Sequence, residues 1–156
     1  MTVFVVRHAD AKSRANWPHP DESRPLTRKG HAQAEGLVDL LRKHPIERVL
    51  SSPAVRCVDT VSPLAHKVGQ KVEEADELQE GTDPHTTYKL LQNLARESGD
   101  SVVCTHGDIV PELLRIATRD GLTLDDAARW PKGSTWVIET DGKRFKRGWY
   151  LAPPEG

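Results

Sequence analysis

The chain has 156 residues, a length typical of one domain, and folding at this size buries about two thirds of the surface of the unfolded chain. Its 22 lysines and arginines nearly balance 23 aspartates and glutamates, and the formal net charge of −1 gives no reason to expect nucleic acid as a partner. No segment has the character of a membrane span or a signal peptide, so we expect one cytoplasmic domain over residues 1–156 that does not bind a membrane.

The first elements in the chain are a strand and a helix with a long connection between them. Val3–Val6 is a short apolar run typical of a buried strand. The later segment has Thr27 as a helix N-cap, a helical apolar stripe, and Pro45 as the stop. Between them, Ala9 to Pro25 shows no periodicity over about seventeen residues, which is longer than a compact domain tolerates without a functional reason.

The middle of the chain predicts a second strand and an interrupted helix. Ile46–Ser52 has the composition of a strand. Apolar residues recur at helical spacing over Pro53–Gly69, with Gly69 as the end. Because proline lacks the N–H that a helix interior needs, we expect Pro63 to break this helix and Ser62 to cap a second short one.

The last part of the chain continues the alternation of strands and helices. Thr86–Glu97 and Asp108–Thr118 are predicted helices on either side of the buried strand Ser101–Thr105, and residues 134–140 and 147–152 form a closing hairpin. Strands alternating with helices indicate an α/β fold, a three-layer sandwich with a mostly parallel sheet and helices on both faces.

The two cysteines, Cys57 and Cys104, lie in apolar stretches, which favours a packing role in a reducing compartment. A cysteine-based phosphatase has an arginine six positions after its nucleophile, but Pro63 and Val110 occupy those positions here. The spacing therefore excludes that chemistry.

Polar residues follow three predicted strands at their carboxyl ends, where ligands collect in parallel sheets. Arg7 and His8 close the first strand, Ser52 closes the second, and His106 follows Thr105. Arg56 lies one helical turn beyond Ser52. Two histidines and two arginines, if charged, would repel one another without an anion between them. Phosphate is the anion that fits best, because the arginine fork binds phosphoryl oxygens and a neutral imidazole can attack phosphorus. The other five histidines are expected at the surface.

Four segments in this order, "VVRHADA", "LTRKGHAQA", "VLSSPAVRCVDT" and "VVCTHGDIV", resemble the motifs of the histidine phosphatase superfamily, also called phosphoglycerate-mutase-like. The resemblance covers nearly the whole chain. It implies a phosphoric monoester hydrolase in which His8 attacks phosphorus and becomes phosphohistidine. Arg7, Arg56 and His106 match the phosphate pocket of that family, and no metal or cofactor is expected.

Two branches of the family suggest different substrates. "RPLT" resembles the short SixA-type phosphohistidine phosphatases and implies Arg24 as a further contact, with a phosphohistidine protein as substrate. A closer resemblance, through "RCVDTVSPLA", "VVCTHGDIVPELL" and "KGSTWVI", is to the histidine phosphatase half of actinobacterial Nudix fusion proteins. It implies a nucleotide or another small phosphorylated metabolite. Lys12, Arg14 or Lys132 would hold extra phosphates, and Ser52 and Gly107 complete the candidate substrate contacts.

The sequence departs from the family pattern at one position and leaves one role open. Ala9 replaces the usual glycine after the histidine, which puts a methyl group near the pocket. The segment "DELQEG" aligns Glu80 with the acid that protonates the leaving group, but Glu77 and Asp83 compete for that role. SixA-type members lack such an acid.

Three other functions stay open. A mutase would use the same residues, but the long additional segments of family mutases are missing from a chain of this length. A metal-dependent hydrolase could use His8 with Asp10 and His106 with Asp108, although arginines beside a metal ion disfavour it. The simpler interpretation of Asp108 is that it is the N-cap of its helix. A module that binds phosphorylated partners without turnover is the third.

Overall fold

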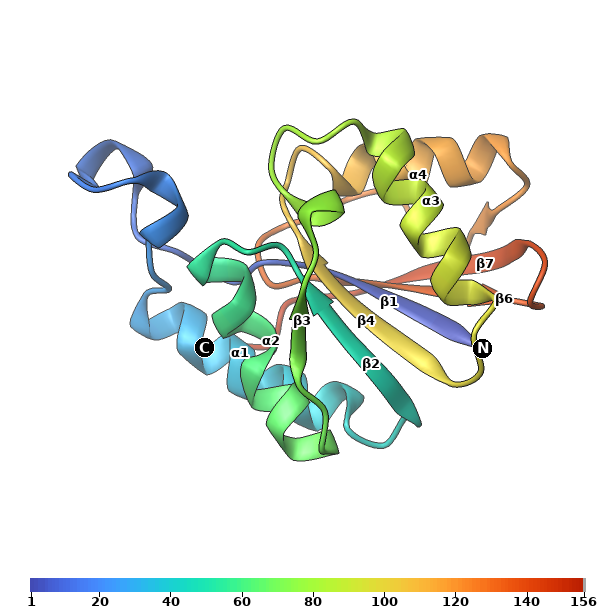
Figure 1. Ribbon diagram of the computed structural model, residues 1–156, viewed down its shortest axis with the longest axis horizontal. Helices are drawn as coiled ribbons and strands as arrows, with labels where there is room; N and C mark the ends of the chain where they lie inside the picture. The colour runs from blue at the N-terminus through green and yellow to red at the C-terminus, as the bar shows by residue number, and fades with distance from the viewer. Residues whose placement is uncertain (156) are drawn as a thin grey trace.

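A seven-stranded sheet with the order β3-β2-β4-β1-β6-β7-β5 runs through the middle of the molecule (Figure 1). The structure is a computed structural model and describes residues 1–155. The strands are β1 (Thr2–Arg7), β2 (Ile46–Ser51), β3 (Val72–Glu74), β4 (Asp100–Thr105), β5 (Thr123–Leu124), β6 (Thr135–Thr140) and β7 (Phe145–Leu151). Strands β1 to β4 pair in parallel, and the hairpin of β6 and β7 adds to β1 in the antiparallel sense. The predicted mostly parallel sheet and the closing hairpin are confirmed.

Helices cover both faces of the sheet, as Figure 1 shows. They are α1 (Arg28–Leu41), α2 (Val55–Val68), α3 (Pro84–Ala95) and α4 (Val110–Arg119). In β1, Phe4 and Val6 pack in a core with α1 and α2, whereas Val3 and Val5 pack in a second core with α3 and α4. Both faces of the strand are therefore buried, which is why its sequence is continuously apolar. The three-layer α/β architecture is confirmed.

Helix α2 corrects one prediction, because it continues without a break through Pro63. Ser62 does not cap a second helix, and its hydroxyl donates to the carbonyl of Val58 at 2.6 Å within the same helix. Val61 and Leu64 are fully buried on either side of Pro63. Their packing holds the helix together although one backbone hydrogen bond is missing. The end at Gly69, with φ of 77°, is as predicted.

The other three helices begin within two residues of their predicted starts. Thr27 caps α1 by accepting from the amide of Gly30 at 3.0 Å, as predicted. Helix α3 begins at Pro84 because the side chain of Asp83 caps it, two residues before the predicted start. Helix α4 begins at Val110, so Asp108 is not its N-cap. Within residues 1–155, no helix has both the length and the apolar character needed to cross a membrane.

The segment without periodicity forms a projection, which we call the finger (residues 12–25). At its base Ala11 pairs with Leu26 in an isolated antiparallel bridge. Beyond the base it contains two short 3-10 helices, η1 (Arg14–Asn16) and η2 (Asp21–Ser23). It projects beyond the carboxyl ends of β1, β4 and β2 (Figure 1). Most of its side chains are exposed, which explains why its sequence carries no core pattern.

Candidate active site

The carboxyl ends of β1, β2 and β4 bring the predicted residues together. Arg7 ends β1 and pairs in register with Thr105 at the end of β4, so His8 and His106 follow neighbouring strands. The two imidazole rings lie edge to face, with centroids 5.6 Å apart. Arg56, in the first turn of α2, is only 1% exposed. This edge of the sheet therefore holds two histidines and two arginines, as the sequence predicts.

The protonation of His8 is fixed by its surroundings. Its Nδ1 lies 2.9 Å from the carbonyl of Ala9, to which it can only donate, so the lone pair is on Nε2. Burial lowers the pKa of His8 to about 3. The bond to the Ala9 carbonyl opposes this shift, and the charges of His106, Arg56 and Arg7 add to it. A neutral imidazole with a free Nε2 is a competent nucleophile at pH 7.

Ala9, which replaces the glycine of the family motif, fits without strain. Its methyl group is fully buried in a small cluster with Ala11, Leu26 and Ala34. Its backbone N–H donates to the hydroxyl of Thr60 at 2.9 Å. Apart from glycines, no residue within 1–155 has a positive φ. The methyl group therefore packs into this apolar cluster, and the backbone at this position does not require glycine.

His106 is held by Ser52. The Ser52 hydroxyl lies 2.8 Å from Nε2 of His106 and also accepts from the amide of Ala54 at 3.3 Å. Nδ1 of His106 lies 3.4 Å from Nη2 of Arg56, a group that can only donate, and 3.8 Å from Oε2 of Glu80. Ser52 was predicted to bind substrate; its hydrogen bond shows a further contact that orients His106.

Arg7 and Gly107 fit closely together. Arg7 donates through Nη1 to the carbonyl of Trp130 at 2.9 Å, while its Nε is buried without a partner. A Cβ at Gly107 would lie 2.6 Å from Cζ of Arg7, so only glycine lets the guanidinium lie against this turn. The Nε of Arg56 is also buried without a partner.

Of the three candidate acids, Glu80 reaches the site. Its carboxylate accepts two bonds from Nη2 of Arg14, at 2.9 and 3.0 Å, and lies 3.4 Å from Nη2 of Arg56. Asp83 is occupied as the cap of α3, and Glu77 lines neither cavity of the site. Asp108 accepts from the amide of Gly81 at 2.9 Å and so fastens the loop that carries Glu80.

Two adjoining cavities contain all the residues predicted for the site, and Glu80 lines both. The larger, of about 490 Å³, is lined by Arg7, His8, Ala11, Lys12, Ser13, Arg14, Arg24, Glu80, Gly107 and Lys132. The smaller, of about 220 Å³, is lined by Asp21, Glu22, Ser52, Pro53, Ala54, Arg56, Gln79, Glu80 and His106. A phosphoryl group held by all four basic residues would lie where the cavities meet, beside Glu80.

Asp21 and Thr60 contribute to the site without having been predicted. Asp21, in the finger, binds Arg56, and Thr60 joins the backbone of Ala9 to α2. The signal for Asp21 was an acidic residue within the arginine-containing stretch "DESRP" of an otherwise unexplained long loop. Nothing local in the sequence marks Thr60, whose contact spans 51 positions.

The aspartates proposed as metal ligands are bound elsewhere. The carboxylate of Asp10 accepts from the hydroxyl of Thr27 at 2.6 Å, and that of Asp108 accepts from Gly81. Among residues 1–155, no three His, Cys, Asp or Glu side chains are grouped so that they could hold a metal ion.

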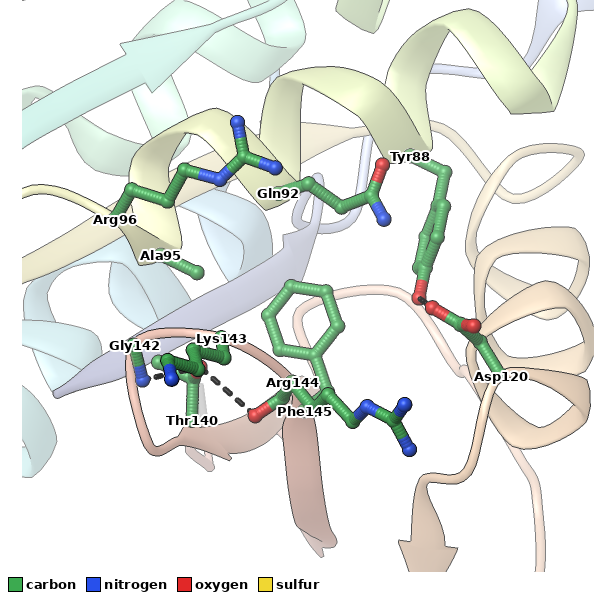
Figure 2. Close-up of a pocket in the computed structure, with 10 residues that line it drawn as sticks. All are labelled: Tyr88, Gln92, Ala95, Arg96, Asp120, Thr140, Gly142, Lys143, Arg144 and Phe145. Carbon is green, nitrogen blue, oxygen red and sulfur yellow. Dashed lines mark hydrogen bonds between the residues drawn. The ribbon is translucent and has the colours of Figure 1, made fainter.

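A separate depression lies between α3, α4 and the turn from β6 to β7 (Figure 2). Figure 2 shows Tyr88 pointing at Asp120, to which its hydroxyl donates at 2.8 Å. The accessible space is about 20 Å³, enough for about one water molecule. This depression is too small for an organic substrate.

Comparisons with known proteins agree with one another. A model of the histidine phosphatase superfamily (branch 1) matches residues 3–83. The chain is 32% identical to the 8-oxo-(d)GTP phosphatase of Mycolicibacterium smegmatis over 99% of its own length, and it spans about half (49%) of that relative. It is 31% identical to a phosphohistidine phosphatase SixA homolog of Haemophilus influenzae, over 72% of this chain and 77% of the relative.

A search of solved structures finds the same fold. The structure of the protein histidine phosphatase SixA in complex with tungstate superposes with a TM-score of 0.77 and 25% identity, covering 99% of this chain and 97% of that one.

Proposed function

The chain belongs to the histidine phosphatase superfamily, and we propose on that basis that it hydrolyses phosphoryl groups through a covalent phosphohistidine on His8. The observation that carries the proposal is the state of His8: it is buried, neutral at pH 7, and has its lone pair on Nε2. Arg7, Arg56 and His106 surround it with the positive and donor groups that a phosphoryl group requires.

In the first step Nε2 of His8 forms a bond to phosphorus. The bond between phosphorus and the leaving oxygen breaks, and its electron pair goes to that oxygen. Glu80, in its protonated form, gives the oxygen a proton. Arg7, Arg56 and His106 hold the non-bridging oxygens, whose charge they stabilise in the transition state.

In the second step water attacks phosphorus, and the bond to Nε2 breaks with return of its electron pair to the imidazole. The carboxylate of Glu80, now unprotonated, takes the proton of the attacking water. The products are inorganic phosphate and the original enzyme. His8 and Glu80 thus each return to their starting state at the end of the second step.

A small substrate with more than one phosphate suits the larger cavity best. Its volume of about 490 Å³ is in the range of small-molecule sites. Lys12 and Lys132 line it and form no ion pair with any residue in 1–155. These two free cations support a nucleotide or similar phosphorylated metabolite, and one relative is an 8-oxo-(d)GTP phosphatase.

A phosphohistidine protein is the second candidate substrate. It is favoured by the likeness to SixA over nearly the whole chain. Its leaving group is an imidazole, so turnover of such a substrate would depend less on Glu80.

The test of the mechanism is detection of the phosphoenzyme. After reaction with p-nitrophenyl phosphate, the wild type should carry a phosphoryl group that is stable in alkali and labile in acid. His8→Ala should neither turn over nor become labelled, whereas His31→Ala, which alters an exposed histidine of α1, should behave as wild type. EDTA should leave activity intact. Loss of activity in EDTA with recovery on adding a divalent ion would instead establish a metal-dependent hydrolase.

A further inference from the structure

One carboxylate of the finger joins three arginines. Oδ1 of Asp21 accepts from Nε of Arg14 and from Nε of Arg24, each at 3.0 Å. Oδ2 accepts from Nη2 of Arg56, also at 3.0 Å. The finger therefore meets the body of the protein through an ion-pair network at the edge of the site.

The hydrogen bonds between Asp21 and Arg56 fix the orientation of the guanidinium as well as its position. Nη1 of Arg56 donates to the backbone carbonyl of Asp21 at 2.9 Å while Nη2 donates to its side chain. Two bonds to a planar, rigid fork define its plane as well as its position. Arg56 is 1% exposed, so no water layer competes for these donors.

The second anchor of Asp21 is Arg24, at the base of the finger. The side chain of Arg24 is 7% exposed and also donates to the carbonyl of Lys12 at 2.6 Å. Burial by itself raises the pKa of Asp21, but the hydrogen bond from Arg24 and the charges of Arg56, Arg24 and Arg14 outweigh it and lower the pKa. Asp21 is thus ionised at neutral pH, although its side chain is 39% exposed.

We propose that Asp21 is a positioning residue that sets the plane of Arg56, so that the finger is a working part of the phosphate site. This inference rests on the proposed contact between Arg56 and the phosphoryl group. The opposite role, a plug that the phosphoryl group displaces from Arg56, would break both bonds from Arg56 to Asp21. The bonds from Arg14 and Arg24, which belong to the same finger, hold the carboxylate of Asp21 in place against Arg56.

The test compares Asp21→Asn with Glu35→Gln, which removes the same charge from an exposed residue of α1 that lines neither cavity and forms no ion pair within residues 1–155. In Asp21→Asn, the amide can accept from one arginine but turns a donor toward another. We expect inhibition by orthovanadate, a phosphate analogue, to weaken about tenfold, and kcat/KM for p-nitrophenyl phosphate to fall by a similar factor. Glu35→Gln should stay within about twofold of wild type. Unchanged or tighter vanadate binding by Asp21→Asn would overturn the proposal and favour the plug.

A double-mutant cycle separates positioning from a general effect on folding. Lysine at position 56 cannot form the fork, so in an Arg56→Lys background Asp21→Asn should have little further effect on vanadate inhibition. A tenfold loss in both backgrounds would mean that Asp21 acts on the fold and not through Arg56. If Arg56→Lys alone leaves vanadate inhibition unchanged, the proposed phosphate site is wrong. If it weakens inhibition while Asp21→Asn does not, only the role of Asp21 is wrong.

Discussion

Burial and neighbouring positive groups keep His8 neutral, and the same effect links the stability of the protein to pH. The pKa of His8 is 6.5 in the unfolded chain and about 3 in the folded protein. Between these values the unfolded state binds a proton that the folded state does not. The free energy of unfolding therefore decreases as the pH falls through 6.5, and this loss is complete near pH 3.

We accordingly expect His8→Gln to depend less on pH than the wild type between pH 6.5 and 4. The difference in slope should approach about 1.4 kcal/mol per pH unit, the cost of one proton. Urea unfolding at several pH values in this window measures it, with His31→Gln as the exposed control. Parallel curves for the wild type and His8→Gln would show that His8 is protonated in the folded protein as readily as in the unfolded chain.

The role of Glu80 can be tested through the leaving group. An alkoxide leaves with difficulty unless it is protonated, whereas a nitrophenolate needs little help. Glu80→Gln should therefore slow hydrolysis of an alkyl phosphate by about a hundredfold or more, and hydrolysis of p-nitrophenyl phosphate far less. Asp83→Asn, which keeps an oxygen to cap α3 but removes the negative charge, is the control for a change of charge in the same loop. Equal losses on both substrates in Glu80→Gln would exclude Glu80 as the acid and place the enzyme with the acid-less SixA-type members.

Helix α2 positions part of the site, because it carries Arg56 in its first turn and Thr60 one turn later. Thr60 donates to the carbonyl of Arg56 at 2.6 Å and accepts from the amide of Ala9. The orientation of the segment after β1 thus depends on a straight helix at this end. Pro63 leaves only the carbonyl of Asp59 without its helical partner, and the bond from Thr60 to the carbonyl of Arg56 is retained.

Replacing Pro63 by alanine should stabilise the protein. Alanine supplies an N–H for the carbonyl one turn earlier and removes the clash of the proline ring, effects worth about 3 kcal/mol in a helix interior. The greater freedom of the unfolded chain offsets part of this gain, so we expect the free energy of unfolding to rise by about 1 to 2 kcal/mol. Urea unfolding measures the change, and Pro84→Ala, in the first turn of α3 where proline is tolerated, should show no gain. Destabilisation by Pro63→Ala would indicate that the ring itself packs in the core.

At the scale of elements, helices and strands with a periodic apolar pattern could be predicted from the sequence. Features that depend on contacts between distant residues could not. Periodicity located the four helices and the central strands, and Thr27 is the predicted N-cap that the structure confirms. The continuity through Pro63 could not be predicted, because it depends on burial of Val61 and Leu64 in the folded protein. Strands β3 and β5 are too short to leave a pattern.

At the scale of the whole molecule, the site was predictable because it follows from topology. Parallel strands end at one edge, so residues that close β1, β2 and β4 had to meet. The part of the site contributed by the finger could not be predicted from pattern. Asp21 reaches Arg56, 35 positions away, only once a loop without periodicity has folded over the sheet edge.

The distribution of charge over the whole molecule leads to a prediction about the substrate. The net charge is only −1, yet Lys12 and Lys132 leave unpaired positive charge in the larger cavity. A second phosphate held there is attracted through solvent-exposed charges, which salt screens, whereas the buried groups around His8 are screened much less. Raising the ionic strength from about 0.05 M to about 0.3 M should therefore increase KM for a nucleoside diphosphate more than KM for p-nitrophenyl phosphate.

The lysines should account for that difference. Lys12→Gln and Lys132→Gln should each raise KM for the nucleoside diphosphate by about two- to fourfold at low salt, the effect of one exposed charge at close range, and leave p-nitrophenyl phosphate unaffected. Lys71→Gln, which removes an exposed lysine outside both cavities, is the matched control. If the two substrates respond equally to salt and neither cavity lysine matters, no second phosphate is held in the larger cavity. A phosphohistidine protein would then be the better candidate substrate.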